Sequence, residues 1–176
     1  MSKKLFLFLS FLSFLSACRK SETGFEMSYR RQFEIPVGLG TGPSHNFVLV
    51  NIPADTSVFF SINNVTASQV IGVVPRSMNI RTIFQGGGNT FAVVDHVEVV
   101  IFDPDRPNVP EIPIFYRYDV PLSTGDRLDL VPDGNNIRKF LLEGRVFNIR
   151  IKLFFRDFIP RSVETEANIV FLGKTS

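Results

Sequence analysis

The chain has 176 residues, with 19 basic and 17 acidic side chains and a hydrophobic fraction of 44%. This length suffices for one domain with a substantial core, and the near-neutral charge lacks the basic excess typical of nucleic-acid-binding proteins. A single cysteine excludes a disulfide within the chain. We therefore expect one domain with no internal disulfide and no nucleic-acid partner.

The first residues have the three-part layout of a secretory signal peptide. Lys3 and Lys4 give a basic start, residues 5–15 form an apolar run, and Ser16 and Ala17 supply small side chains. The apolar run has about 11 residues, whereas a membrane-spanning helix needs roughly 20. We predict that residues 1–17 are a signal peptide. The mature chain is then formally neutral, because Lys3 and Lys4 are lost with this peptide.

Residues 15–18 read LSAC and place the cysteine, Cys18, directly after the small residues. This segment resembles the lipobox of bacterial lipoproteins. The resemblance implies that the Cys18 thiol receives a diacylglycerol, that cleavage follows Ala17, and that Cys18 becomes the acylated first residue. A thiolate is a suitable nucleophile for this step, and two or more acyl chains hold a protein stably on a membrane. The alternative is an ordinary signal peptide cut elsewhere, which leaves Cys18 as a free thiol.

Arg19 follows the cysteine, where the enterobacterial signal for inner-membrane retention has aspartate. The resemblance therefore favours a cell-envelope location at the outer membrane. Lys20 and Glu22 resemble the residues near the cysteine of some surface-displayed lipoproteins of Bacteroidota, so the periplasmic and surface-facing leaflets both stay open. The chain also resembles the small β-rich envelope lipoproteins of that phylum in general style, without a specific family for the domain.

Residues 18–24 form the lipidated cysteine and a short tether, and residues 25–176 form the domain. The domain begins with apolar alternation in which we predict a phase shift near Arg30, giving a bulge or two successive strands. A glycine-rich loop at residues 38–46 comes next. Two further strands are predicted at residues 47–52 and 57–62.

Residues 64–74 are ambiguous and favour a short helix at 67–71 with Thr66 as N-cap. A strand is predicted at 78–84 and a turn at 85–89. Residues 91–102 then form a strand, with one apolar face and one polar face; the apolar face carries Val97, Val99 and Ile101, and the polar face carries His96 and Glu98.

The remaining segments complete a mainly β pattern. A helix is predicted at 134–142 with Asp133 as N-cap. Strands are predicted at 114–118, 127–131, 147–155 and 163–172, and residues 147–155 show the clearest alternation of the chain. Eight or nine strands at this spacing predict an antiparallel β-sandwich, immunoglobulin-like or related, with one or two short helices.

Oxygen-rich side chains gather in the loop FDPDRPN, which contains Asp103, Asp105 and Asn108. Calcium takes six to eight oxygen ligands, so this loop is a candidate metal site. The alternative is an ordinary polar turn, and the spacing does not match an EF-hand. We predict no cofactor.

Aromatic residues suggest two binding surfaces. Tyr116 and Tyr118 share one strand face and are a candidate ligand face for a glycan, although such a pair also serves ordinary packing. Phe154 interrupts the polar face of its strand, and Phe158 and Ile159 come shortly after it. These three residues predict either a second buried surface or a contact for a partner protein.

Catalytic residues are scarce, because the chain has only two histidines, His45 and His96. A triad of Ser44, His96 and Asp95 can be drawn, but no nucleophile motif supports it. The sequence therefore predicts no enzyme. Our leading hypothesis is a membrane-anchored envelope lipoprotein that binds or scaffolds another envelope protein. A surface glycan-binding module is the alternative, and a hydrolase is the third.

Overall fold

A computed structural model describes residues 24–83 and 90–176. The predicted signal peptide, Cys18, residue 84 of the strand predicted at 78–84 and the turn predicted at 85–89 lie outside the described residues. The described elements are eight strands, two short α-helices and two 3-10 turns: β1 (Gly24–Ile35), β2 (His45–Pro53), α2 (Thr56–Asn63), η2 (Ala67–Gln69), β3 (Val70–Thr82), η3 (Thr90–Val93), β4 (Val94–Phe102), β5 (Ile112–Arg117), β6 (Arg127–Pro132), α3 (Arg138–Leu142), β7 (Val146–Phe155) and β8 (Val163–Thr175). None of the described helices has the length and apolar character needed to cross a membrane.

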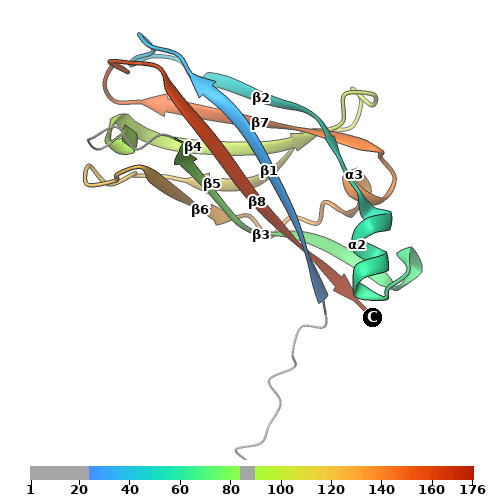
Figure 1. Ribbon diagram of the computed structural model, residues 1–176. Helices are drawn as coiled ribbons and strands as arrows, with labels where there is room; N and C mark the ends of the chain where they lie inside the picture. Colours follow the sequence, from blue (N-terminus) through green and yellow to red (C-terminus); the bar gives the residue numbers. More distant parts are fainter. Residues whose placement is uncertain (1–23, 84–89) are drawn as a thin grey trace, which may run out of the picture.

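The strands form an antiparallel sandwich, which confirms the predicted fold class. Their order is β1-β8-β3-β6-β5-β4-β7-β2. The β5–β6 pairing is short, and the sheet folds over there into two four-stranded layers (Figure 1). Strands pair as β1 with β8, β2 with β7, β3 with β6 and β4 with β5. This nested pairing is that of a jelly roll, a double-sheet fold related to the immunoglobulin sandwich.

Alternating side chains of the two layers meet in an aromatic core. On β7, Phe147, Ile149, Ile151 and Leu153 are fully buried, as the alternation predicted. The ring of Phe147 lies 5.3 Å from Tyr29 of β1 and 6.2 Å from Phe171 of β8, centroid to centroid. The Tyr29 hydroxyl donates a 2.7 Å hydrogen bond to the carbonyl of Ala54, which satisfies its one polar group. Burial, with the charge of Asp55, raises the pKa of Tyr29.

Helix α2 fills the space between β1 and β2, which are the two edge strands of the sheet order. Phe60 packs on Phe25 at 5.8 Å, and Phe59 packs on Tyr29 at 5.7 Å. The prediction of a strand at 57–62 is therefore wrong. Phenylalanine and valine favour strands in isolation, but here two neighbouring rings pack against one edge strand from a helical turn.

Strand β1 also differs from the prediction. Its register with β8 runs unbroken from Gly24 to Ile35, so there is no bulge near Arg30. Odd-numbered residues point inward throughout, and the half-buried Arg31 occupies one of these positions. In the sequence, a charged residue at an inward position looks like a phase shift of the alternation. In the fold it is tolerated, because the stem of a long side chain can be covered while its charged head reaches water.

Two helix predictions change in extent. Thr66 is confirmed as an N-cap, but of the single turn η2, and β3 already begins at Val70. Helix α3 begins after Ile137, not after Asp133. The Asp133 N–H donates to the carbonyl of Ile114 at 2.8 Å, and residues 133–137 connect β6 to α3 without regular secondary structure.

The connections gather at two opposite ends of the sandwich. The start of β1, α2, η2, the 103–111 loop, α3 and the C-terminus lie at one end, which we call the tether end (Figure 1). The loops at 36–44, 118–126 and 156–162 lie at the other, which we call the loop end.

Candidate functional site: an aromatic row on one outer face

The outer face of the β2-β7-β4-β5 layer carries aromatic side chains in place of the expected charges. On β4 the inner face is formed by buried valine and isoleucine, so His96 and Glu98 point outward. His96 is in register with Phe154 of β7, and Glu98 with Lys152 of β7 and Tyr116 of β5. Residues from three strands therefore share this outer surface.

Four side chains on this side of the sandwich form a continuous line, which we call the aromatic row. Their order along it is Tyr116, Tyr118, His96 and Phe154. The His96 and Phe154 rings are stacked, with centroids 3.7 Å apart and planes 18° from parallel. Tyr118 lies 5.9 Å from His96 and 5.2 Å from Tyr116. Tyr118, between Tyr116 and His96, is 55% exposed, so the row contains an accessible ring.

Polar groups fix the loop-end margin of the row. His96 Nδ1 lies 3.0 Å from Asp95 Oδ2, and the other Asp95 oxygen lies 3.5 Å from Arg156 Nη2. Arg156 also donates from Nη2 to the carbonyl of Val120 at 2.6 Å, while its Nε is buried without a hydrogen-bond partner. The histidine ring is thus held at its edge by a carboxylate and on its face by Phe154.

Charged side chains flank the row on its other margin. Glu98 and Lys152 are cross-strand neighbours. Arg150 forms an ion pair with Glu111, and its guanidinium lies 4.9 Å from the Phe102 ring centre. The surface therefore offers flat rings for stacking next to groups of both charges.

The aromatic residues that the sequence suggested as binding surfaces lie in two different places in the structure. Tyr116 and Tyr118 do lie together, and neither is buried in the core. Phe154 belongs to the same row. Phe158 lies in the 156–162 loop, 64% exposed, where its ring covers Gly40.

Ile159 is 3% exposed and belongs to the core, so of the two alternatives predicted for it the structure shows the buried surface. Its N–H donates to Leu39 and its carbonyl accepts from Gly38, and this exchange between two loops draws the side chain inward.

The residues of the drawn triad do not assemble. Asp95 and His96 are in contact, but among the described residues no serine hydroxyl lies within hydrogen-bond reach of either histidine. His45 lies at the start of β2, where its Nε2 pairs with the carbonyl of Gly40 at 3.0 Å.

The candidate calcium loop is occupied by its own side chains. Asp103 is buried; its Oδ2 accepts from Arg106 Nε at 2.6 Å and its Oδ1 accepts from the Asp105 N–H. Burial alone would raise the pKa of Asp103, but these hydrogen bonds and the charge of Arg106 lower it. The described part of the chain contains no group of three or more His, Cys, Asp or Glu residues arranged to hold a metal ion.

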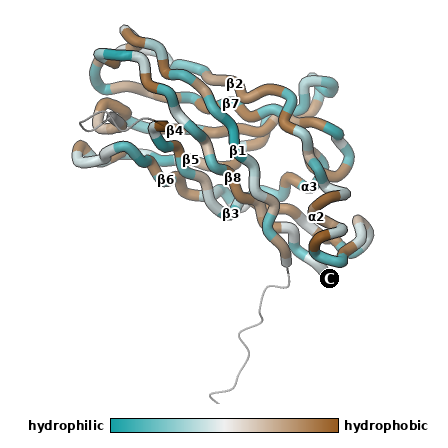
Figure 2. Tube along the Cα trace, viewed as in Figure 1, coloured by the Kyte–Doolittle hydropathy of each residue, from teal (hydrophilic) through white to brown (hydrophobic). Residues whose placement is uncertain are grey.

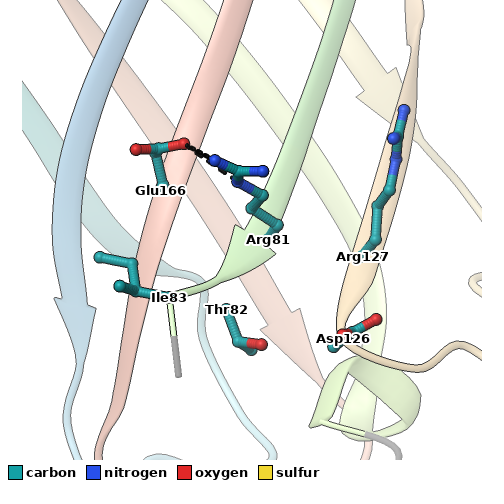
Figure 3. Close-up of a pocket in the computed structure, with 6 residues that line it drawn as sticks. All are labelled: Arg81, Thr82, Ile83, Asp126, Arg127 and Glu166. Carbon is teal, nitrogen blue, oxygen red and sulfur yellow. Dashed lines mark hydrogen bonds and ion pairs between the residues drawn. The ribbon is translucent and has the colours of Figure 1, made fainter. Parts of the chain in front are cut away.

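A polar hollow of about 380 Å³ lies on the other layer, towards the loop end, at the ends of β3 and β6 (Figure 3). Arg81 and Arg127 face each other across these strands. Each is already engaged, since Arg81 binds Glu166 and Arg127 binds Asp129, both at 2.7 Å. The charges of the hollow therefore balance within the protein, and we do not assign it a ligand.

Sequence reasoning missed the part that His96 has in the row. Its outward position was predicted, but its partner was not, because Phe154 is far away in the sequence. The available signal was that aromatic residues occupy the polar positions of two separate strands.

No protein family matches this sequence, and no curated protein matches it either. Among solved structures, the chain is similar to a decameric BFDV capsid protein, with 12% identity over 86% of this chain and 99% of that chain, at a TM-score of 0.31. It is also similar to Desmodium yellow mottle tymovirus, with 10% identity over 90% of this chain and 93% of that chain, at a TM-score of 0.28. Similarities this low have no bearing on function.

Proposed function

We propose that this protein is a lipid-anchored module of the bacterial cell envelope that binds another envelope protein through the aromatic row. The anchor is the acylated Cys18 implied by the lipobox resemblance, and the role is binding, not catalysis. The observation that carries the proposal is a row of aromatic rings on the outer face of the sandwich, in which Tyr118 is exposed and the other three are half-buried.

The composition of the surface supports a protein partner. Protein interfaces are enriched in tyrosine, phenylalanine and arginine at their centres, with polar side chains around them. Here the Asp95–Arg156 ion pair adjoins His96, and the charged residues Glu98 and Lys152 are in register with Tyr116. A preformed surface also loses little conformational entropy on binding, because the His96–Phe154 stack is already in place.

A glycan is the second candidate, and the exposure of Tyr118 favours it. An exposed ring beside a second tyrosine at 5.2 Å suits stacking against a sugar face. Jelly rolls also include lectin domains, which is an analogy at the level of the fold. The oxygen-rich residues Asp103, Asp105 and Asn108 do not add to this surface, because they lie at the tether end.

The experiment has two parts. Mass spectrometry of the N-terminal peptide from membrane-extracted protein, compared with Cys18→Ala, tests the anchor. A photo-crosslinking amino acid at Tyr118 in living cells tests the surface, with the same group at exposed Glu164 on the other outer face as the matched control.

A protein adduct at position 118 that disappears in the Phe154→Ala background and is absent at position 164 would support the protein partner. Binding of purified polysaccharide that depends on Tyr118, without a protein adduct, would replace it with the glycan. Adducts of equal yield at both positions would refute the aromatic row as the binding surface.

A further inference from the structure

The tether end carries a surface without charge, which we call the α2 cap (residues 56–71). No Asp, Glu, Lys or Arg occurs between Asp55 and Arg76, although 20% of the whole chain is charged. Three aliphatic side chains are exposed on the cap: Val58 by 53%, Ile62 by 71% and Ile71 by 61%. The brown segments at α2 in Figure 2 mark this apolar stretch.

The geometry of α2 accounts for this exposure. Phe59 and Phe60 are directed towards β1, where they pack on Tyr29 and Phe25. Val58 and Ile62 are four residues apart and therefore share the side of the helix that the core leaves free. The remaining exposed side chains of the helix are hydroxyls and amides, which can meet polar headgroups without burying a charge.

The cap lies next to the point where the chain leaves the domain. Gly24, the first residue of β1, is in register with Lys174 of β8, and Lys174 is in register with Gly72 of β3. Ile71 is thus two strands away from the start of β1, and α2 contacts the second residue of that strand. Figure 1 shows α2 and the beginning of β1 at the same end.

The length of the tether keeps this end close to the anchor. Gly24 is six positions after Cys18, and a fully extended chain of that length spans about 20 Å. An anchored domain therefore presents the cap to the bilayer at a high effective concentration, so that a weak apolar contact is sufficient to orient it.

We infer that the α2 cap rests on the lipid bilayer, with Val58, Ile62 and Ile71 at the boundary between headgroups and acyl chains. The inference builds on the proposed lipid anchor. It assigns the membrane as the occupant of this apolar surface, in the manner of interfacial helices. The loop end, with Tyr118 near it, then points away from the membrane towards a partner.

The absence of tryptophan makes a direct test possible. Residues 18–176, which contain every described residue, are coupled through Cys18 to a maleimide lipid. The vesicles contain phosphatidylethanolamine and phosphatidylglycerol with brominated acyl chains. Single probes are Ile62→Trp at the cap and Leu122→Trp at the loop end, two positions of similar exposure, 71% and 68%. Circular dichroism of each variant checks that the fold is retained.

We expect Ile62→Trp to lose most of its emission and to shift to shorter wavelength, and Leu122→Trp to keep both its intensity and its wavelength. Adding Val58→Ser and Ile71→Ser should restore the emission of the cap probe. Equal quenching of both probes, or of neither, would overturn the inference, as would a dimer of the chain that protects Ile62→Trp from the bromines. Because the chemical coupling replaces the cell's own anchor, this result is independent of whether peptide mass spectrometry finds Cys18 acylated.

Discussion

The two layers of the sandwich have similar inner faces and different outer faces. Inside, Phe147 of one layer and Phe171 of the other meet in one aromatic core. Outside, the β1-β8-β3-β6 layer carries ion pairs centred on Glu166, whereas the β2-β7-β4-β5 layer carries the aromatic row. The inner faces are constrained by the fold, so the difference between the outer faces is where function is to be sought.

The outer face of the β1-β8-β3-β6 layer, which we call the ionic face, has charged groups that are paired with one another. Glu166 is 6% exposed, and one of its oxygens accepts from Arg81 Nη2 at 2.7 Å and from Asn168 at 3.2 Å, with Arg30 at 3.5 Å. The aromatic row has a stacked pair, His96 and Phe154, at one end and an exposed ring, Tyr118, next to that pair. The charged groups at the centre of the ionic face are thus paired within the protein, whereas the other outer face has an exposed aromatic ring, the feature on which the proposed function rests.

The largest expected loss of stability tests whether the inner faces of the two layers contribute equally to one core. Phe171→Ala and Phe147→Ala should each lower the free energy of unfolding by about 3 to 5 kcal/mol, because each leaves a cavity in the core. Urea unfolding followed by circular dichroism measures both. A loss confined to one of the two variants would mean that the layers do not share one core.

The next effect belongs to the ionic face. Glu166→Ala should lower the free energy of unfolding by about 1 to 2 kcal/mol, since it removes the shared acceptor of two arginines that are themselves more than half exposed. Glu164→Ala, an exposed position on the same face of β8, is the control and should stay within about 0.5 kcal/mol of the unmodified protein. Equal losses would show that the Glu166 network contributes nothing specific.

Alternation of apolar and polar residues predicted some elements of the two layers correctly and others wrongly. The inner face of β7 was predicted correctly because five apolar residues alternate without interruption. In β1 a single inward arginine hid the same periodicity, and in α2 two adjacent phenylalanines mimicked a strand. Each error arose where one residue's tertiary environment outweighed the local pattern.

The aromatic row was only half predictable for a different reason. Tyr116 and Tyr118 are separated by one residue, so their common face can be deduced from strand geometry alone. The stacking of His96 on Phe154 depends on the register of β4 with β7, which includes a shift between Val94 and His96. The sequence left burial of Ile159 and contact with a partner both open, because its burial depends on hydrogen bonds to a loop more than a hundred residues earlier.

A smaller effect distinguishes the two outer faces by their response to salt. Phe154→Ala removes the ring stacked on His96 without removing a charged or polar group, and should cost about 1 kcal/mol of unfolding free energy. This cost should be nearly the same in dilute buffer and in high salt, whereas the cost of Glu166→Ala should shrink as salt screens the arginines. Phe158→Ala, at an exposed loop position, is the control for general loss of aromatic surface. If the cost of losing the stack fell with salt as much as the cost of losing the ion pairs, the two outer faces would not differ in the kind of interaction that holds them.

The smallest effect is the dependence of the ionic face on pH. Burial would raise the pKa of Glu166, but the hydrogen bonds from Arg81 and Asn168 and the charges of Arg30 and Arg81 outweigh it, so the pKa lies below its ordinary value. A carboxyl group whose pKa is lower in the folded state stabilises the fold above its unfolded pKa, and this contribution is lost as pH falls through the folded pKa. Unfolding free energy should therefore decline below about pH 4, the ordinary range of glutamate. The decline should be shallower in Glu166→Gln, whose side chain does not titrate, while Phe154→Ala, which removes no titratable group, should retain the slope of the unmodified protein. If Glu166→Gln showed an unchanged acid slope, the acid dependence would come from another carboxyl group, such as Asp103 in the 103–111 loop. The contrast between the two outer faces would then be one of shape, not of charge.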